Sequence, residues 1–419
     1  MKKILTIIAG LFMVVSLRAQ DKDTFEVQKI GDKYFVIMDH KDPDTTRYMP
    51  LDHHKKFDEH FMVVGLTTVG FNQQWITTSS TLGMVSNQKS KTNTIGDPDN
   101  FEFSPMLLWR HGDKFLMEFE PSFTAGGIGV NWADVHYFVA PGLIIRAGYM
   151  VLPFGTYSKR LAAGWINKFG YDPVGATSAP VGSDWGVAIG GGAQAGKMKV
   201  NYDLCLANGF NVGNDGQVTN PGIVANANMA KTVCGRFGWL PIPNSSLEIG
   251  ISGLYSKVGM NRTSSPDSAH NGSVIMGAAD LQYIYAKNPI QITIKGQYNM
   301  SYVTNFTYTN PNDGTDFTFT NKSYGYYGML ALRPVVTNKI LRNFEIAGRY
   351  SAYQTPVGSG WESNTRQIDV ALDYWINWRT VIKLCYENLL QTNPANGTLV
   401  PTDNRTLSHI LQVQFSIQL

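Results

Sequence analysis

The stretch LSHILQVQFSIQL, residues 407–419, decides the fold class of this chain. Its side chains alternate between two faces, with the two-residue period of a β-strand. One face carries Leu407, His409, Leu411, Val413, Phe415, Ile417 and Leu419, and the other carries Ser408, Ile410, Gln412, Gln414, Ser416 and Gln418. Only His409 and Ile410 depart from the rule. The stretch therefore predicts a strand with one apolar and one polar face.

The same alternation recurs from about residue 60 onward, and the charged residues fall almost wholly on the polar face. We predict sixteen strands, near 61–72, 101–111, 114–123, 128–140, 143–152, 184–194, 197–208, 229–240, 247–257, 272–286, 290–303, 322–334, 341–353, 365–376, 378–390 and 406–419. Their connections alternate between short turns such as HGDK and AKNP and long loops such as 73–100 and 153–183.

An up-and-down barrel with tight turns at one rim and long loops at the other explains this alternation. Strands can cross hydrocarbon only as a closed sheet, because every backbone polar group there needs an internal partner. The sequence therefore predicts an all-β fold, a transmembrane antiparallel up-and-down β-barrel of about sixteen strands over residues 60–419. A secreted soluble sandwich or propeller stays an alternative, although its strands usually run about 5 to 6 residues.

Residues 1–20, MKKILTIIAGLFMVVSLRAQ, have a basic end, a short apolar core and a small residue before a predicted cut at Gln20. These are the features of a cleaved signal peptide. The apolar core is too short to span a bilayer. We expect residues 21–59 to form a periplasmic N-terminal extension, with a hairpin in FEVQKIGDKYFVIM that turns at Gly31-Asp32. The predicted location is the outer membrane of a Gram-negative cell.

The charge balance argues against a nucleic-acid partner. The chain has 35 basic and 32 acidic residues, and the leader holds three of the basic ones, Lys2, Lys3 and Arg18. Subtracting these three leaves 32 of each sign in the mature chain, a formal net charge of zero. Nucleic-acid binding would then lack its electrostatic basis.

The sequence predicts neither a metal site nor a cofactor. His53, His54 and His60 lie among charged residues of a linker, and their spacing is not that of a structural metal site. Phosphate-cradling and dinucleotide-binding glycine motifs are missing from the sequence. His136, near Asp134 on the predicted lumen face, is the candidate base of an outer-membrane hydrolase. We favour a pore-lining histidine there, and the chain is predicted not to be an enzyme.

Three cysteines, Cys205, Cys234 and Cys385, are too few for a disulfide framework. Cys205 and Cys234 fall on consecutive predicted strands at similar distances from the loop that joins them. They are therefore candidate cross-strand neighbours on the lumen face. A disulfide needs Cα atoms about 4.4–6.8 Å apart, and a register shift of one or two residues would forbid it. Both a bond and free thiols stay open.

The segment WADVHYFVAPGLIIRAGYMVLPFGTY, residues 132–157, resembles the strand, tight turn, strand and PFG sequence of the phosphate-selective porin O and P family. The resemblance is strongest over about residues 100–210. It implies an outer-membrane channel, usually a homotrimer in membrane lipid, with the third long loop folded inward and basic residues that select anions. On that basis we expect loop 153–183 to form the constriction, with Lys159, Arg160 and Lys168 as anion contacts beside Arg146.

The predicted lumen face is not a basic ladder, however. It carries Arg110, Arg146, Lys199, Arg236, Lys295, Arg349 and Lys383 against Glu102, Glu118, Glu120, Asp134, Asp203, Glu248, Asp280, Glu345, Asp369, Asp373 and Glu387. Mixed walls create a transverse field with weak net selectivity. We predict a passive channel for small hydrophilic solutes or anions such as phosphate. The alternatives are an outer-membrane hydrolase and a surface-binding or adhesion barrel that works through its long loops.

Overall fold

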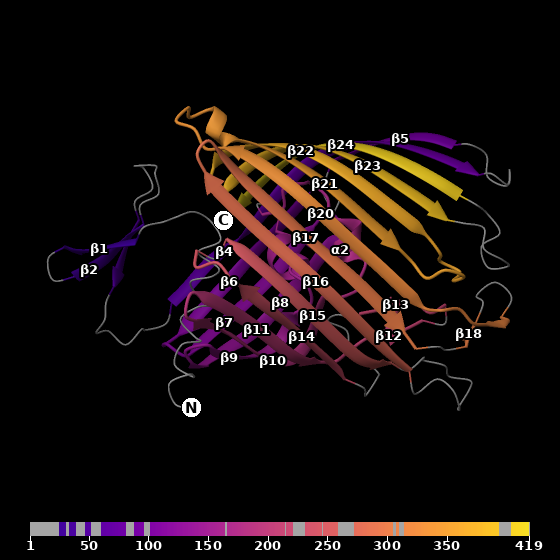
Figure 1. Ribbon diagram of the computed structural model, residues 1–419, viewed down its shortest axis with the longest axis horizontal. Helices are drawn as coiled ribbons and strands as arrows, with labels where there is room; N and C mark the ends of the chain where they lie inside the picture. The colour runs from indigo at the N-terminus through magenta and orange to yellow at the C-terminus, as the bar shows by residue number, and fades with distance from the viewer. Residues whose placement is uncertain are drawn as a thin grey trace.

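The computed structural model describes residues 25–30, 33–38, 47–51, 60–80, 88–95, 101–163, 166–213, 215–220, 231–244, 246–258, 272–304, 307–309, 314–393 and 404–418. Sixteen antiparallel strands of this part of the chain close into a barrel with strongly tilted strands (Figure 1). They are β4 (His60–Ser80), β6 (Phe101–His111), β7 (Phe115–Thr124), β8 (Gly127–Ala140), β9 (Leu143–Val151), β10 (Ser183–Ala195), β11 (Met198–Ala207), β14 (Thr232–Leu240), β15 (Leu247–Val258), β16 (Gly272–Lys287), β17 (Ile290–Val303), β20 (Lys322–Pro334), β21 (Phe344–Gln354), β22 (Asn364–Asn377), β23 (Thr380–Asn393) and β24 (Asn404–Gln418).

The barrel closes where its last strand meets its first. Strand β24 pairs with β4 from Asn404 opposite Ser80 to Gln418 opposite Leu66. The predicted number of strands and their up-and-down order are confirmed, and most predicted boundaries lie within a few residues of the observed ones. Short turns join β6 to β7, β8 to β9 and β10 to β11 at one end, and the long connections lie at the other.

The two faces of each strand have opposite character. On β24, the inward Gln412 and Ser416 are fully buried, whereas Leu411 and Val413 point outward and are 40% and 46% exposed. The same reversal holds on β22, where Asp369 and Asp373 are buried and Val370 is exposed. The protein thus keeps polar side chains inside and apolar side chains outside, the opposite of a water-soluble fold.

One predicted loop proved to be partly strand. We expected a connection over residues 73–100, but β4 continues to Ser80 and β5 (Gln88–Ile95) pairs with its outer part. The register runs from Phe71 opposite Ile95 to Thr78 opposite Gln88. The sequence here is rich in Gln, Thr and Ser on both faces. Strands without a distinct apolar face give no alternation, so the pattern could not reveal this extension.

A small separate sheet precedes the barrel. It consists of β1 (Phe25–Ile30), β2 (Lys33–Met38) and β3 (Arg47–Leu51), and Figure 1 shows β1 and β2 beside one end of the barrel. The predicted hairpin is confirmed as the β1–β2 pair, with Phe25 opposite Met38. The predicted signal peptide, the Gly31-Asp32 turn and the histidines at 53 and 54 lie outside the described residues.

The segment between β9 and β10 folds into the barrel. It contains the π-helical turn η3 (Tyr157–Leu161) and the short helix α2 (Val174–Thr177), which contacts β17, β20 and β21. Figure 1 shows α2 within the outline of the barrel. Elsewhere, β12 (Asn211–Val212) pairs with β13 (Val218–Thr219), β18 (Tyr308–Thr309) pairs with β19 (Asp316–Phe317), and the 3-10 turn η4 (Leu341–Asn343) precedes β21. Among the described residues, no helix is long and apolar enough to cross a membrane.

Candidate functional site

The loop of residues 153–183, which we call the constriction loop after its predicted role, first forms hydrogen bonds between its backbone and polar side chains of the inner wall. The Gly155 amide donates to Ser252 Oγ on β15 at 2.9 Å. The amides of Thr156 and Tyr157 both donate to Gln297 Oε1 on β17, at 2.8 and 3.1 Å. Gly155 has a φ of +63°, and a Cβ atom there would overlap the Gln297 side chain. Glycine in the PFG sequence therefore permits this close approach.

The middle of the loop is attached to the inner wall through α2, which forms hydrogen bonds with side chains of β17, β21 and β22. The Val174 amide donates to Gln367 Oε1 at 2.8 Å, and the Gly175 amide donates to Ser351 Oγ at 2.7 Å. Asn299 donates from Nδ2 to the carbonyl of Gly175 at 3.0 Å. A Cβ atom at Gly175 would overlap the backbone of Tyr326, so the helix packs directly on β20.

A third set of contacts fixes the stretch between η3 and α2. Arg349 donates to the carbonyl of Tyr171 at 2.7 Å, and Lys383 donates to the carbonyl of Phe169 at 3.4 Å. The Tyr157 hydroxyl donates to Asp172 Oδ1 at 2.5 Å, which joins the two ends of this stretch. The loop thus contacts walls from β15 round to β23, as expected for a loop folded inward.

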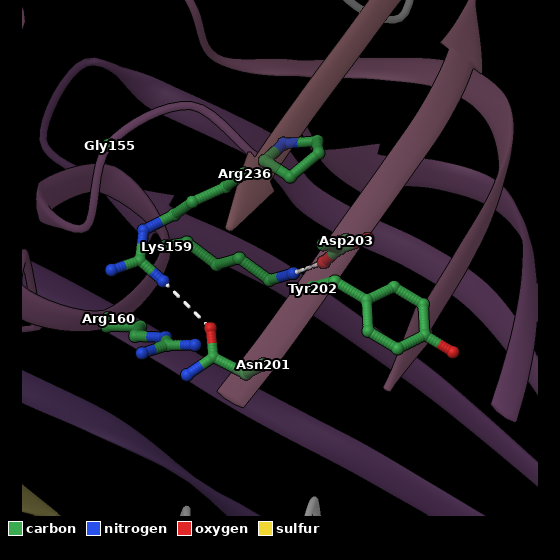
Figure 2. A pocket seen from close by; sticks show the side chains of 8 residues that line it. Gly155, Lys159, Arg160, Asn201, Tyr202, Asp203 and Arg236 are labelled. Carbon is green, nitrogen blue, oxygen red and sulfur yellow. Dashed lines mark hydrogen bonds and ion pairs between the residues drawn. The ribbon is translucent and has the colours of Figure 1, made fainter. Parts of the chain in front are cut away.

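Two of the predicted anion contacts meet on one carboxylate. Arg146 on β9 donates from Nη2 to both oxygens of Asp203 on β11, each at 2.7 Å. Lys159 of η3 forms an ion pair with the same carboxylate, as Figure 2 shows. Residue 146 lies on the inward face of β9, and η3 turns the Lys159 side chain toward β11. The shared carboxylate explains how two cations are tolerated side by side.

Arg160 belongs to the same group of charges. It donates from Nη1 to Glu248 on β15 at 2.9 and 3.1 Å. Arg236 on β14 contacts Glu248 at 3.0 Å and Asp280 at 2.6 Å. It also donates to Asn201 Oδ1 at 3.1 Å, as Figure 2 shows. Pro153, Gly155, Lys159, Arg160, Asn201, Tyr202, Asp203 and Arg236 line a small pocket between the loop and the wall. We call Arg146, Lys159, Arg160 and Arg236 with their carboxylates the charge cluster.

The charge cluster is close to electrical balance. Its four cations face Asp203, Glu248 and Asp280, and Asp134 lies 4.0 Å from Arg146. Burial, together with the neighbouring Arg146, lowers the pKa of Lys159 to about 8 against the opposing effect of Asp203. The proton on Lys159 therefore decides whether the cluster is neutral or carries a net negative charge.

Lys168 lies apart from the charge cluster. It pairs with Glu345 on β21 at 2.9 Å, and its Nζ lies 4.7 Å from the ring centre of Trp375 on β22. The structure thus brings three of the four predicted contact residues together and places the fourth on another part of the wall. Its partner Glu345 also accepts a hydrogen bond from Trp375 Nε1 at 2.8 Å.

His136 on β8 lies among carboxylates. Its Nε2 lies 3.2 Å from Asp134 Oδ2 and 3.7 Å from Glu118 Oε2 on β7. Within the described residues these three form the group whose ligand atoms could hold a metal ion. A histidine ring that is hydrogen-bonded to Asp134 and lies near Glu118 accounts for the same arrangement, and we assign no ion here. Within the described residues His136 pairs with carboxylates, whereas the hydrolase alternative needs a serine beside it.

The sequence predicted that Arg236 lies on the lumen face, but it did not predict that Arg236 joins the residues around Lys159 and Arg160. Its position on the polar face of a predicted strand was visible, but its opposition to Asp203 depends on the β11–β14 register. The neutral anchors Ser252, Gln297, Ser351 and Gln367 were missed altogether. Uncharged polar side chains at alternating positions are the signal for a lumen face, but they do not tell which of them bind a loop.

No protein-family model matches the chain, and no curated protein matches it in sequence. The structure resembles an anion-selective porin from Comamonas acidovorans, with a TM-score of 0.52 and 11% identity over 86% of this chain and 100% of that one. The barrel has the fold of a porin. The outer membrane channel DcaP of Acinetobacter baumannii gives a TM-score of 0.50 and 11% identity, over 87% of this chain and 99% of that channel.

Proposed function

We propose that the chain is an outer-membrane porin through which small hydrophilic solutes, including anions such as phosphate, cross by passive diffusion. The observation that carries the proposal is a closed barrel whose apolar face points outward while a loop folds against its polar inner wall. A protein that surrounds a watery path in lipid needs this distribution of side chains. The proposed function needs neither catalysis nor a cofactor.

We propose Lys159 and Arg160 as the residues that meet the solute directly. Their side chains are 23% and 29% exposed, whereas Arg146 and Lys168 are 11% and 14% exposed and are more fully covered by their partners. Arg146 would then act through its shared carboxylate, Asp203, and Lys168 through the attachment of the loop. All four keep the role of constriction residues, with two in contact with the solute and two in support.

The proposal also covers location and assembly. Residues 1–20 would be removed on export, residues 21–59 would lie in the periplasm, and residues 60–419 would form the barrel in outer-membrane lipid. Porins turn tightly on the periplasmic side, and the β4 strand that follows residues 21–59 begins at the short-turn end. The suspected membership of the phosphate-selective porin O and P family further suggests a homotrimer, which crosslinking in native membranes would test.

Planar-bilayer recording tests the channel and its ion preference together. We expect a stable conductance, and a reversal potential under a salt gradient that reports the preference. Replacing Lys159 and Arg160 together, Lys159→Gln with Arg160→Gln, should shift the reversal potential toward cations. The shift should grow at low salt, because the Debye length rises from about 8 Å at 0.15 M to about 30 Å at 0.01 M.

The matched control removes the same charge far from the constriction. Lys197 and Lys339 lie exposed in the short turns between β10 and β11 and between β20 and β21. Lys197→Gln with Lys339→Gln should leave the reversal potential near that of the parent protein. A protein that inserts but conducts nothing would refute the channel. Equal shifts in both double variants would refute the special role of Lys159 and Arg160.

A further inference from the structure

The two cysteines whose pairing the sequence left open lie directly opposite each other. Cys205 on β11 and Cys234 on β14 are Cα partners in the register, and both are present as free thiols. Directly opposite residues of an antiparallel pair have Cα atoms about 4.5 or 5.5 Å apart, depending on the kind of pair. Both separations fall inside the range of about 4.4–6.8 Å that a disulfide requires.

Both side chains are on the inner face and almost fully covered. Cys205 is 3% exposed and Cys234 is 0% exposed, and they pack in one apolar cluster with Leu152 and Phe154. The Cys234 thiol donates to the carbonyl of Pro153 at 3.5 Å. The pair therefore lies beneath the point where the constriction loop leaves the wall.

The third cysteine has a different environment. Cys385 on β23 stands opposite Ala371 on β22 and Gln412 on β24. It is buried in a separate cluster with Phe169 and Tyr327. Cys385 thus has the same burial without a cysteine across the strand, and it serves as an internal reference.

We infer that Cys205 and Cys234 form an intramolecular disulfide in the exported protein, a covalent link between β11 and β14 under the constriction loop. The inference rests on the export that we propose, because disulfides form and persist in oxidising compartments such as the periplasm. The link would fix the register of these two strands. It would also remove the hydrogen bond that the Cys234 thiol donates to the carbonyl of Pro153, because a disulfide sulfur carries no hydrogen.

The oxidant in this step is the disulfide of a thiol–disulfide exchange protein. One cysteine thiolate attacks that disulfide and forms a mixed disulfide, and the second thiolate then displaces the exchange protein. Two thiols of the chain become one disulfide, and the exchange protein takes up the two electrons and two protons as a dithiol. Because both sulfur atoms are buried in the closed barrel, we place this step before the barrel closes.

Counting free thiols by mass tests the inference on the full chain. The protein is produced with its own leader, isolated from outer membranes, and denatured in an alkylating reagent without reductant. We expect one alkyl group per chain, at Cys385, and three after prior reduction of the denatured chain. Three groups without reduction would overturn the inference, and so would a peptide map that shows Cys385 in the bond.

The same mass spectrum separates this test from that of the proposed location. A chain that keeps residues 1–20 contradicts the proposed export, whereas a processed chain with three free thiols contradicts the disulfide alone. Cys205→Ser and Cys234→Ser should each leave the other cysteine of the pair as a free thiol, so that it and Cys385 give two alkyl groups per chain. Cys385→Ser should give none. Reductant applied to the folded barrel should still leave one group, because burial protects the bond until the chain is unfolded.

Discussion

Lys159 is the residue whose protonation controls the balance of the charge cluster. An ordinary lysine keeps its proton to a pH of about 10.4, but burial beside Arg146 lowers the pKa of Lys159 to about 8. We therefore predict that anion preference, measured as the reversal potential under a salt gradient, falls as the pH rises from 7 to 9. The loss should be half complete near pH 8, because the neutral amine no longer offsets the surrounding carboxylates.

Lys159→Arg is the control for this titration. A guanidinium stays charged over the whole range, since its pKa lies above about 12, so the reversal potential of this variant should be flat between pH 7 and 9. If the variant titrates like the parent protein, another group controls the ion preference and the role given to Lys159 is wrong.

At the scale of elements, the placement of the constriction loop depends on α2 lying directly on β20. Gly175→Ala would force the helix away from the Tyr326 backbone and weaken the hydrogen bonds of the Val174 and Gly175 amides. We predict faster tryptic cleavage of the folded barrel at Lys159, Arg160 or Lys168. If the substitution costs the attached state of the loop about one or two kcal/mol, the cleavage rate should rise by about 5- to 30-fold.

Gly182→Ala is the matched control in the same loop. A Cβ atom there would have the side chain of Asn220 as its nearest neighbour, 3.9 Å away. Cleavage of this variant should match that of the parent protein. Equal resistance of Gly175→Ala would mean that the remaining contacts hold the loop without α2.

The outward face of the strands gives a prediction about depth in the membrane. Val370 lies at the middle of β22 and is 48% exposed, whereas Ile376, which is also 48% exposed, lies near the short-turn end of the same strand. Val370→Lys should lower the free energy of unfolding in lipid vesicles by about 2–4 kcal/mol, and Ile376→Lys by about 0–1 kcal/mol. Equal costs at the two depths would contradict a lipid-facing β22.

How much of these elements the sequence could predict depends on the physical signal that each one leaves. The alternation in 407–419 reports a local property of the chain, so strands and turns followed from it. The pairing of Arg146 with Asp203 depends on a register between distant segments, and the binding of Gln367 to α2 depends on the path of the loop. Neither leaves a local pattern. The resemblance suggested the inward loop, but not which wall residues hold it.

The whole molecule has no free edge in its barrel wall, and this should be visible in its unfolding. We predict that the purified chain in detergent migrates anomalously on a gel without heating, and at its full mass only after boiling. A closed ladder of hydrogen bonds has no terminal strand from which to separate, so the compact form should resist mild detergent. A monomer that stays folded in water without detergent would refute the membrane barrel.

Closure also determines when the protein can fold. Thr68 and Ser416, which are 348 positions apart in the chain, meet through their hydroxyl groups where β4 and β24 pair. If the chain is exported as we propose, the first wall strand cannot pair with its second neighbour until the final strand has crossed the inner membrane. Contacts between such distant positions form slowly, and unpaired strand edges invite aggregation in the meantime. On that proposed route the chain must stay unfolded until all of it has been exported, and a polypeptide that ends before residue 404 would lack the strand that closes the barrel.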